Sequence, residues 1–261
     1  MRKGVQVYTV RDFIDTEEGY IDSLKKIKAM GYDSVQTYTK FYTPEEHKKL
    51  LDEIGLKSET AGGDYQTMLE SESAIETAIH EADVMETDLI GVGTMPTEYR
   101  DSEEGFKRYA QGVNKICSTL QKSGKRLIYH PHALEFYSFG GGRNGMDILT
   151  GETDEKGFCF VLDTHWLQSG GQNPAAYIRR LKGRLPIIHF KDYKITGGAA
   201  FIEEVRKDFA EMGEGNLNWQ EIVEACKEVG VHAAIIEQDV CQRNPFDCLL
   251  TSYNNMIAYN V

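Results

Sequence analysis

The stretch FCFVLDTHW, residues 158–166, joins a predicted strand to a group of polar side chains. Its first five residues are apolar and rich in aromatic and β-branched types, which predicts a strand over Phe158–Asp163. The strand ends abruptly in Asp163, Thr164, His165 and Trp166, and Asp and His are metal-binding residue types. A change of this kind at the carboxyl end of a strand is typical of the functional edge of parallel α/β folds.

The same pattern recurs along the chain, where short apolar runs alternate with amphipathic stretches that end at glycine. Strands are predicted at Gly4–Tyr8, Ser34–Tyr38, Leu56–Glu59, Asp88–Val92, Arg126–His130, Phe158–Asp163, Leu185–Phe190 and Ala233–Glu237. Capping residues predict helix starts at Asp15, Thr43 and Asp101, each followed three residues later by glutamate. Eight strand–helix units in 261 residues average about 33 residues each, close to the size of a βαβ unit.

Two α/β architectures accommodate such units. A doubly wound sheet normally has a glycine-rich turn after its first strand, whereas the turn over residues 9–12 contains no glycine. A barrel instead places functional side chains at the carboxyl ends of several strands, as the fifth to eighth predicted strands do. We therefore expect a single (β/α)8 TIM-barrel domain over residues 1–261.

Four neighbouring strand ends carry residue types that bind metals or transfer protons. They are His130, His132 and Glu135 after the fifth strand, Asp163 and His165 after the sixth, His189 and Lys191 at the seventh, and Glu237 at the eighth. Any one acid in such a place could instead cap a helix or pair with a neighbouring charge. A barrel, however, would bring all four ends to one mouth. A Glu, an Asp, a His and a Glu, one from each end, would form an oxygen-rich set with one imidazole, which suits one divalent ion, Mn²⁺ first, with Mg²⁺, Co²⁺ and Zn²⁺ as alternatives.

The composition argues against nucleic acid and anionic membranes as partners. The 29 Lys and Arg residues are outnumbered by 41 Asp and Glu residues, which gives a formal net charge of −12. Such a surface repels phosphate, and no apolar run reaches the ~20 residues of a membrane-spanning helix. Five dispersed cysteines without CxxC spacing, and no signal-peptide pattern, favour a cytoplasmic protein with buried thiols.

As a set, several motifs give the chain a resemblance to a known family over nearly its whole length. They are GVQVYTVRD (4–12), YHPH (129–132) with Glu135-Phe136, DTHW (163–166) with Gly170-Gly171, HFKD (189–192), GEG (213–215) with Trp219, and EQD (237–239). The chain resembles the sugar isomerase/epimerase family of xylose-isomerase-like barrels, which is related to the endonuclease IV fold. These motifs are specific to the family and not to one reaction within it.

The resemblance implies one divalent metal ion held by Glu135, Asp163, His189 and Glu237. It also implies that two metal-bound glutamates, here Glu135 and Glu237, act on opposite sides of a substrate carbon as the acid and base. A dication polarises the carbonyl and stabilises the enediolate, so a carboxylate suffices as the base. Relatives are often dimers or tetramers, so a homo-oligomer is a further expectation.

The fifth strand departs from the family pattern. In related epimerases the first glutamate lies at the strand end, whereas here His130 and His132 occupy that place and Glu135 comes later in the loop. The two histidines share one face because strand side chains alternate. Either the loop brings Glu135 back to the metal and the histidines contact the substrate, or a histidine is the ligand.

Four further side chains are expected near the substrate. Lys191 should point into the barrel, where it either binds a substrate oxygen or forms an ion pair with Asp163 or Glu237. His165 shares a face with Asp163 and is expected to line the pocket. Trp166 and Tyr8 are expected as apolar walls, with core packing as the alternative for each.

The leading functional hypothesis is a metal-dependent sugar isomerase or epimerase that removes a proton next to the carbonyl of a ketose or polyol ketone. The main alternative is an inosose or keto-sugar dehydratase, which begins with the same step and then expels a β-hydroxyl. His130 and His132 could supply the acid for that departure. A third hypothesis, from another class, is a non-catalytic sugar-binding or partner subunit.

Three further predictions concern regions away from the strand ends. Residues 193–216 are expected to form a rim or lid loop rather than a structured insertion. The Gly213-Glu214-Gly215 motif is not expected to bind phosphate, because Glu214 and the acidic composition oppose an anion. His47, His80 and His232 are expected to lie on the surface.

Overall fold

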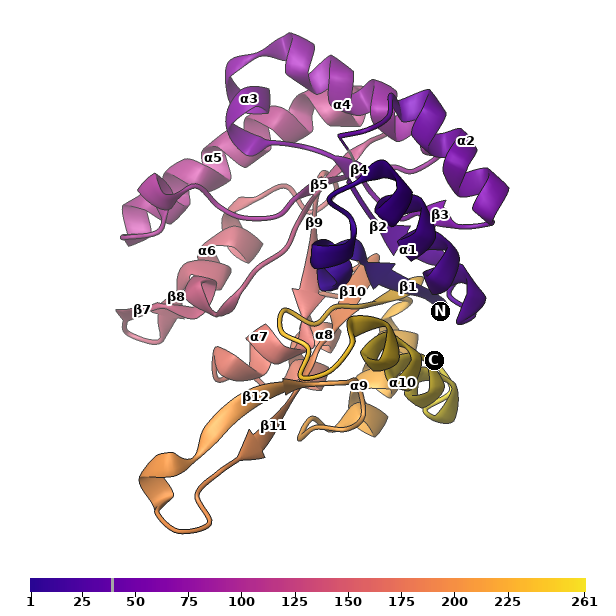
Figure 1. Ribbon diagram of the computed structural model, residues 1–261. Coiled ribbons are helices and arrows are strands. Elements are labelled where there is room, and N and C mark those ends of the chain that lie inside the picture. Colours follow the sequence, from indigo (N-terminus) through magenta and orange to yellow (C-terminus); the bar gives the residue numbers. More distant parts are fainter. Residues whose placement is uncertain (39) are drawn as a thin grey trace.

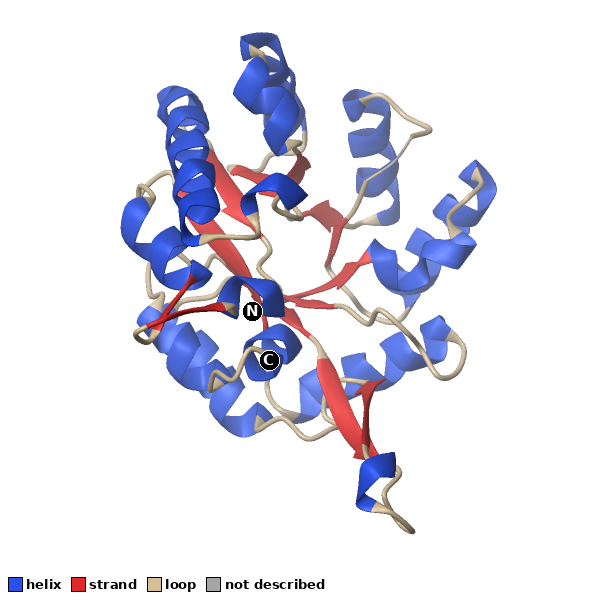
Figure 2. Cartoon of the chain, turned by 90° about the vertical axis from the view of Figure 1, so that its left-hand side faces the viewer, coloured by secondary structure: helices blue, strands red, loops and turns tan. Residues whose placement is uncertain are grey.

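The computed structural model describes residues 1–38 and 40–261, and it confirms the predicted barrel. The main sheet has nine strands in the order β3-β2-β1-β13-β10-β9-β6-β5-β4. All pairs of hydrogen-bonded neighbours within it run parallel. β3 pairs with β2 and β4 pairs with β5, so these two short strands act as halves of one barrel strand. Helices surround the sheet (Figure 1), and Figure 2 looks into the ring of strands.

The strands lie close to their predicted positions. Their bounds are β1 (Arg2–Gln6), β2 (Ser34–Gln36), β3 (Lys57–Ser58), β4 (Ala61–Gly62), β5 (Leu89–Val92), β6 (Arg126–Tyr129), β9 (Phe158–Asp163), β10 (Ile187–Phe190) and β13 (Ala233–Ile236). β1 ends earlier than predicted because a 3-10 helix, Val7–Phe13, begins directly after it.

The outer layer contains more helices than the amphipathic pattern predicted. Their bounds are α1 (Glu17–Ala29), α2 (Pro44–Ile54), α3 (Tyr65–Glu70), α4 (Glu72–Val84), α5 (Glu103–Leu120), α6 (Gly145–Glu152), α7 (Thr164–Ser169), α8 (Pro174–Arg180), α9 (Trp219–Val229) and α10 (Pro245–Ala258). The short helices α3, α6 and α7 escaped the sequence analysis because one or two turns show too few repeats of the 3.6-residue period.

The helix starts test the predicted caps directly. Thr43 caps α2 in a complete capping box, as predicted. α1 and α5 are capped one residue later than predicted, by Thr16 and Ser102. The hydroxyls of these residues accept hydrogen bonds from the N–H groups of Gly19 and Gly105. In both helices a hydroxyl therefore forms the cap that was predicted for the carboxylate of the preceding aspartate.

The apolar core has two parts, and the smaller one fills the barrel. It consists of Leu89, Ile128, Cys159, Val161, Ile187, Ala233 and Ile235. These positions recur with a spacing of two along β9 and β13, as expected when alternate side chains of a strand point inward. The larger part lies between the sheet and the helices.

The segment predicted as an irregular lid is instead a β-hairpin, so that prediction was wrong. β11 (Asp192–Thr196) pairs antiparallel with β12 (Arg206–Ala210), and the hairpin extends away from the barrel (Figure 1). Phe201 and Ile202 near its tip are 66% and 79% exposed. A shorter hairpin pairs β7 (Ser138–Gly140) with β8 (Arg143–Asn144).

The GEG motif binds a carboxylate of the protein itself. The buried Asp192 accepts hydrogen bonds from the backbone N–H groups of Gly213, Gly215 and Leu217 and from the indole N–H of Trp219. Backbone N–H groups arranged in this way form an anion cradle, and Asp192 already occupies it. The motif is therefore structural and fixes the root of the hairpin.

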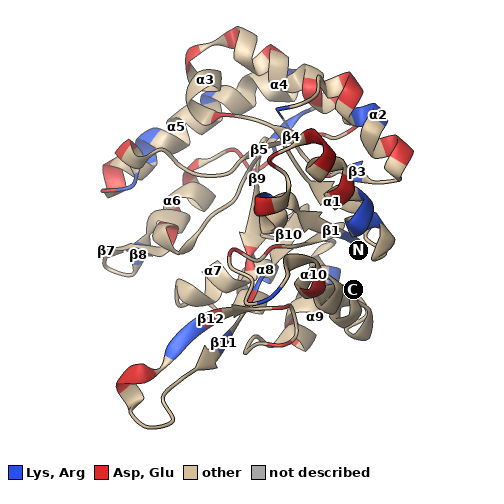
Figure 3. Ribbon diagram, viewed as in Figure 1, with Lys and Arg blue, Asp and Glu red and all other residues tan. Residues whose placement is uncertain are grey.

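His47 was predicted to lie on the surface, but it is only 5% exposed. Its ring contacts Tyr20 and Tyr42 and its Nε2 hydrogen-bonds the Tyr20 hydroxyl, so the surface prediction was wrong there. His80 and His232 are exposed as predicted, and all five cysteines are free. Figure 3 shows Lys and Arg scattered among Asp and Glu over the outer helices.

Among the described residues, no helix has both the length and the apolar character that crossing a bilayer requires.

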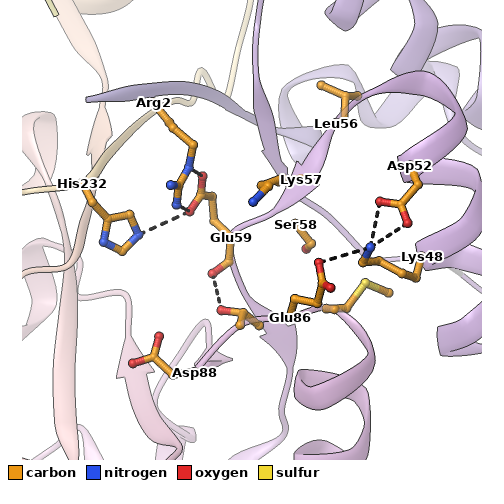
Figure 4. A pocket seen from close by; sticks show the side chains of 12 residues that line it. Arg2, Lys48, Asp52, Leu56, Lys57, Ser58, Glu59, Glu86, Asp88 and His232 are labelled. Atoms are coloured by element: carbon orange, nitrogen blue, oxygen red, sulfur yellow. Dashed lines mark hydrogen bonds and ion pairs between the residues drawn. The ribbon is translucent and has the colours of Figure 1, made fainter.

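An ion pair between the half-exposed Arg2 and the buried Glu59 lines a pocket beside the starts of β1 and β13 (Figure 4). The Glu59 carboxylate, 3% exposed, receives two hydrogen bonds of 2.8 Å from the Arg2 guanidinium and lies 3.3 Å from His232 Nε2. Burial alone would raise the pKa of Glu59, but the hydrogen bonds from Arg2 and His232 hold it at about 2. The charged form is thus favoured in the folded state.

We expect Glu59→Gln to lower the free energy of unfolding by about 2–3 kcal/mol at pH 7. Because the folded pKa lies below the unfolded value, this contribution is complete above pH ~4.5 and is lost as the pH falls towards 2. Urea unfolding of both proteins at pH 7, 4 and 3 would show the difference shrinking. The control is Glu53→Gln, from an exposed pair with Lys49 at 3.9 Å, which should change stability by less than about 0.5 kcal/mol. An equal loss at every pH would contradict this account.

Candidate metal centre

Strand alternation carries the site residues into the barrel mouth. Val161, Ile187 and Ile235 belong to the interior core, so the residues two positions further along face the interior as well. The interior therefore ends in Asp163 on β9, in His189 on β10 and in Glu237 after β13. His130 follows β6 in the same way, two residues after the interior residue Ile128.

These four residues form one compact group. One ligand atom from each of His130, Asp163, His189 and Glu237 lies within 4.8 Å of the others. His189 Nδ1 is 2.8 Å from Glu237 Oε2, and His130 Nε2 is 3.6 Å from Asp163 Oδ2. Asp163, His189 and Glu237 are at most 6% exposed.

The ammonium of Lys191 is the cation of this group. Its Nζ lies 3.0 Å from Asp163 Oδ2, 3.0 Å from Glu237 Oε2 and 3.1 Å from Asp239 Oδ2. Burial alone would raise the pKa of Asp163, but Lys191 and His130 hold it at about 2. The pKa of Glu237 is likewise held well below its usual range against burial, by His189 and Lys191. Lys191 therefore forms ion pairs with Asp163 and Glu237, which is one of the two roles predicted from the sequence.

The donor atoms of the group fit a divalent metal ion. The buried ring nitrogens His130 Nε2 and His189 Nδ1 face the Asp163 and Glu237 carboxylates. The carboxylate oxygens Asp163 Oδ2 and Glu237 Oε2 are also paired with the Lys191 ammonium. Two imidazole nitrogens with two carboxylate oxygens are a common ligand set for divalent transition metals. Asp239, which is not one of these four residues, forms a further ion pair with the Lys191 ammonium.

The structure places Glu135 elsewhere. Its side chain is fully buried, accepts a hydrogen bond of 2.7 Å from the His132 backbone N–H and is hydrogen-bonded to the Tyr129 hydroxyl. Burial raises the pKa of Glu135 despite these bonds. His130 stands in the group of ligand atoms instead. Of the two alternatives for the fifth strand, this geometry favours a histidine ligand, and Glu135 fixes the loop that follows.

A wall of rings borders the group. The His132 ring lies 4.6 Å from the His130 ring and 5.5 Å from Trp166, and Lys191 Nζ is 5.3 Å from the centre of a Trp166 ring. His165 packs between Trp166 and Phe209 of the hairpin, at 4.7 and 4.8 Å. The hairpin root therefore forms part of the site, which sequence analysis missed.

Two ring nitrogens in this wall make no hydrogen bond to described residues, His165 Nδ1 and Trp166 Nε1, whereas the His132 side chain faces the backbone N–H of Glu135 in a capping box. Burial lowers the pKa of His132 to about 4, so its imidazole is neutral at pH 7. Tyr8 lies apart from the wall, 41% exposed, with the Arg11 guanidinium over its ring.

Sequence analysis gave no role to two other site residues. Asp239 pairs with Lys191, and its position two residues after Glu237 could have indicated this from strand alternation. Gln36, the last residue of β2, contacts His189 through its side chain. A glutamine at the end of the predicted second strand carries no comparable signal, because glutamine is common on protein surfaces.

Comparison with known proteins agrees with this fold. A family model described as a xylose isomerase-like TIM barrel matches residues 24–243. Among curated proteins, an inosose dehydratase of Clostridium beijerinckii is 27% identical over 168 residues, which cover 58% of this chain and 53% of that protein. The chain thus spans about half the length of the curated relatives it matches.

Solved structures share the architecture. A sugar phosphate isomerase/epimerase from Parabacteroides distasonis superposes with a TM-score of 0.77 at 19% identity, covering 98% of this chain and 94% of that chain. A probable 3-DHS dehydratase involved in petrobactin synthesis, from Bacillus anthracis, has a TM-score of 0.74 at 15% identity, covering 98% and 99%. At these identities the likeness is one of fold.

We expect Lys191→Met to destabilise the metal-free protein by about 3–5 kcal/mol, because it leaves buried carboxylates without their cation. Urea unfolding in the presence of a chelator measures the loss. Lys182→Met, at an exposed position, is the control and should change stability by less than about 0.5 kcal/mol. If the Lys191 variant matched wild type, the ion pairs would not hold the carboxylates in place.

Proposed function

Because the chain belongs to the xylose isomerase-like TIM barrel family, we propose that it is a metal-dependent dehydratase of an inosose or related keto-sugar. The enzyme would remove the proton next to the carbonyl and then expel the β-hydroxyl as water. One observation carries this choice over an isomerase. The His132 imidazole, neutral at pH 7, borders the ligand group at 4.6 Å from the His130 ring, whereas the Glu135 carboxylate is engaged elsewhere. The names of the curated relatives support the same choice.

In this proposal His130, Asp163, His189 and Glu237 hold one divalent ion. The mixed nitrogen and oxygen donors suit Mn²⁺, which we expect to be preferred. When bound, the ion would supply a Lewis acid that stabilises negative charge on the substrate carbonyl oxygen. Lys191, held beside Asp163 and Glu237, would keep the ligand carboxylates ionised.

His132 would carry the proton between the two steps. As a neutral imidazole at pH 7 it accepts the proton from the carbon next to the carbonyl and becomes imidazolium. It then gives that proton to the departing hydroxyl, which leaves as water while the carbon–carbon double bond forms. The proton is therefore conserved, and His132 returns to its starting state.

The ring wall would recognise the substrate. Trp166 offers an indole N–H, and His165 offers a ring nitrogen without a partner among the described residues, so both can hydrogen-bond sugar hydroxyls. Their faces, with that of Phe209, suit the C–H side of a polyol ring. Tyr8 at the rim would contact the substrate only at its edge. That the chain is cytoplasmic and forms a homo-oligomer stays a prediction.

An isomerase or epimerase is the second candidate, because it shares the first step. It would return the proton to a carbon atom instead of to a hydroxyl, and the Glu237 carboxylate at the centre could serve as its base. A non-catalytic sugar-binding or partner subunit would bind the ligand and do neither.

We expect purified wild type to contain about one divalent ion per chain after preparation with manganese, as one set of four ligands requires. Asp163→Asn should abolish this occupancy, and Asp208→Asn on the hairpin, outside the ligand group, should retain it. Elemental analysis provides the measurement. Wild type without metal even at excess manganese would refute the proposed mechanism and favour a binding role.

The reaction type can be determined by incubating the enzyme with inososes and ketoses in D₂O and analysing the products. We expect loss of water with an unsaturated ketone product. His132→Gln should slow it by about 10²–10⁴-fold with unchanged metal content, while the exposed His80→Gln should leave the rate unchanged. Deuterium incorporation without loss of water would show an isomerase or epimerase. Binding with neither reaction would show a sugar-binding protein.

A further inference from the structure

The hairpin of β11 and β12 has an apolar face that begins in the site and continues beyond the barrel. Tyr193 pairs with Phe209, so both side chains lie on one face of the hairpin, and they pack against the His165 ring at 5.4 and 4.8 Å. Strand alternation places Ile195 and Val205 on the same face further out, where each is almost half exposed. The ring wall of the site thus extends into solvent as a strip of apolar side chains.

The tip of the hairpin adds two apolar side chains, Phe201 and Ile202, that are mostly exposed. Contacts within the tip fix its shape. The Glu204 N–H donates a hydrogen bond of 3.0 Å to the Phe201 carbonyl, and Gly197, at φ +73°, lies so close to the Glu204 carbonyl that a side chain there would collide with it. A contiguous exposed apolar surface of this kind marks an interaction site on a soluble protein.

A pocket on the rim of the barrel mouth, the rim pocket, matches the tip in size. It lies beside the segments that follow the carboxyl ends of β1 and β2. Its lining includes three aromatic rings, two cations and one carboxylate: Tyr20, Tyr38, Phe41, Arg11, Lys40 and Asp15. The pocket has a volume of about 150 Å³, and an apolar cavity of about this volume can hold a benzene ring. It can therefore accept the ring of a phenylalanine.

The charges of the tip and the rim pocket are complementary. The tip carries two adjacent exposed carboxylates, Glu203 and Glu204. In the rim pocket, the cations Arg11 and Lys40 outnumber the carboxylate of Asp15. Opposite charges on two surfaces favour their association and select the partner.

We propose that a second copy of this chain covers the hairpin: in a twofold-symmetric dimer, the Phe201 ring of each hairpin tip sits in the rim pocket of the other barrel. The hairpin extends away from its own barrel (Figure 1), so the tip is directed towards another molecule. Twofold symmetry forms the contact twice, which doubles the buried area towards the ~800 Å² per partner of a stable interface.

The dimer would complete the mouth of each barrel. The Arg11 guanidinium in the rim pocket donates a hydrogen bond of 2.8 Å to the Asp239 carbonyl oxygen, and the Asp239 carboxylate pairs with Lys191. The partner's Phe201 would therefore cover the rim beside the buried carboxylates and limit the access of water. This consequence rests on the proposed function, whereas the dimer itself does not.

The oligomeric state tests the hairpin contact. Sedimentation equilibrium at micromolar concentrations should show a wild-type dimer. Ile202→Asp puts a charge into the proposed interface and should weaken dimerisation about 10²-fold, with an unchanged circular dichroism spectrum because Ile202 is mostly exposed. Ile257→Asp, at a half-exposed position of α10, is the control and should dimerise like wild type. A monomeric wild type, or a dimer that Ile202→Asp does not weaken, would overturn the proposal.

A charge swap tests the rim pocket as the seat of the tip. The double variant Glu203→Lys, Glu204→Lys brings lysines to Lys40, and Lys40→Glu brings a carboxylate to the two glutamates, so each protein alone should dimerise about 10-fold more weakly. Mixed in equal amounts, the two proteins should form a heterodimer, because both contacts then pair opposite charges. Native mass spectrometry distinguishes it from the homodimers.

A mixture without a preferred heterodimer would show that the tip sits elsewhere and would refute the exchange, while the proposed function would stand. Conversely, a heterodimer formed by a protein that dehydrates no inosose or keto-sugar would support the exchange and refute the proposed function.

Discussion

Negative charge inside the barrel is the constraint on which the site depends. Asp163 on β9 and Glu237 after β13 end two strands whose other inward residues are apolar, so their carboxylates leave water at a cost of several kcal/mol each unless a cation is near. Lys191 supplies that cation from inside the protein, since it lies two residues after His189 on the same face. The arrangement that would hold a divalent ion is therefore already charge-compensated.

Two carboxylates outside this centre, Asp192 and Glu135, have structural roles, although they lie close in sequence to residues of the centre. Asp192 is the neighbour of Lys191, so alternation sends it away from the barrel interior, and backbone N–H groups of the GEG loop surround it. Glu135 is likewise held by Tyr129 and by the backbone of His132. The partners around a carboxylate, rather than the residue type, decide whether it shapes a loop or meets a cation.

Local patterns explain why some features were predictable and others were not. The apolar runs of the strands and the hydroxyl caps are set by neighbours in sequence, and the barrel followed from them. The hairpin was missed because the outer halves of its two strands carry only half-buried or exposed side chains, which removes the contrast between a buried and a solvated face. His47 was misjudged because its aromatic neighbour Tyr20 comes from another helix.

The barrel and the four strand ends that carry functional side chains follow from local sequence patterns, because a period of two residues is a local property of each strand. The tertiary structure alone decided that His130 rather than Glu135 joins Asp163, His189 and Glu237. It also decided that Gln36 meets His189, 153 residues away. Such contacts depend on how a loop leaves its strand and on which distant groups satisfy each buried polar atom, and no local pattern records either.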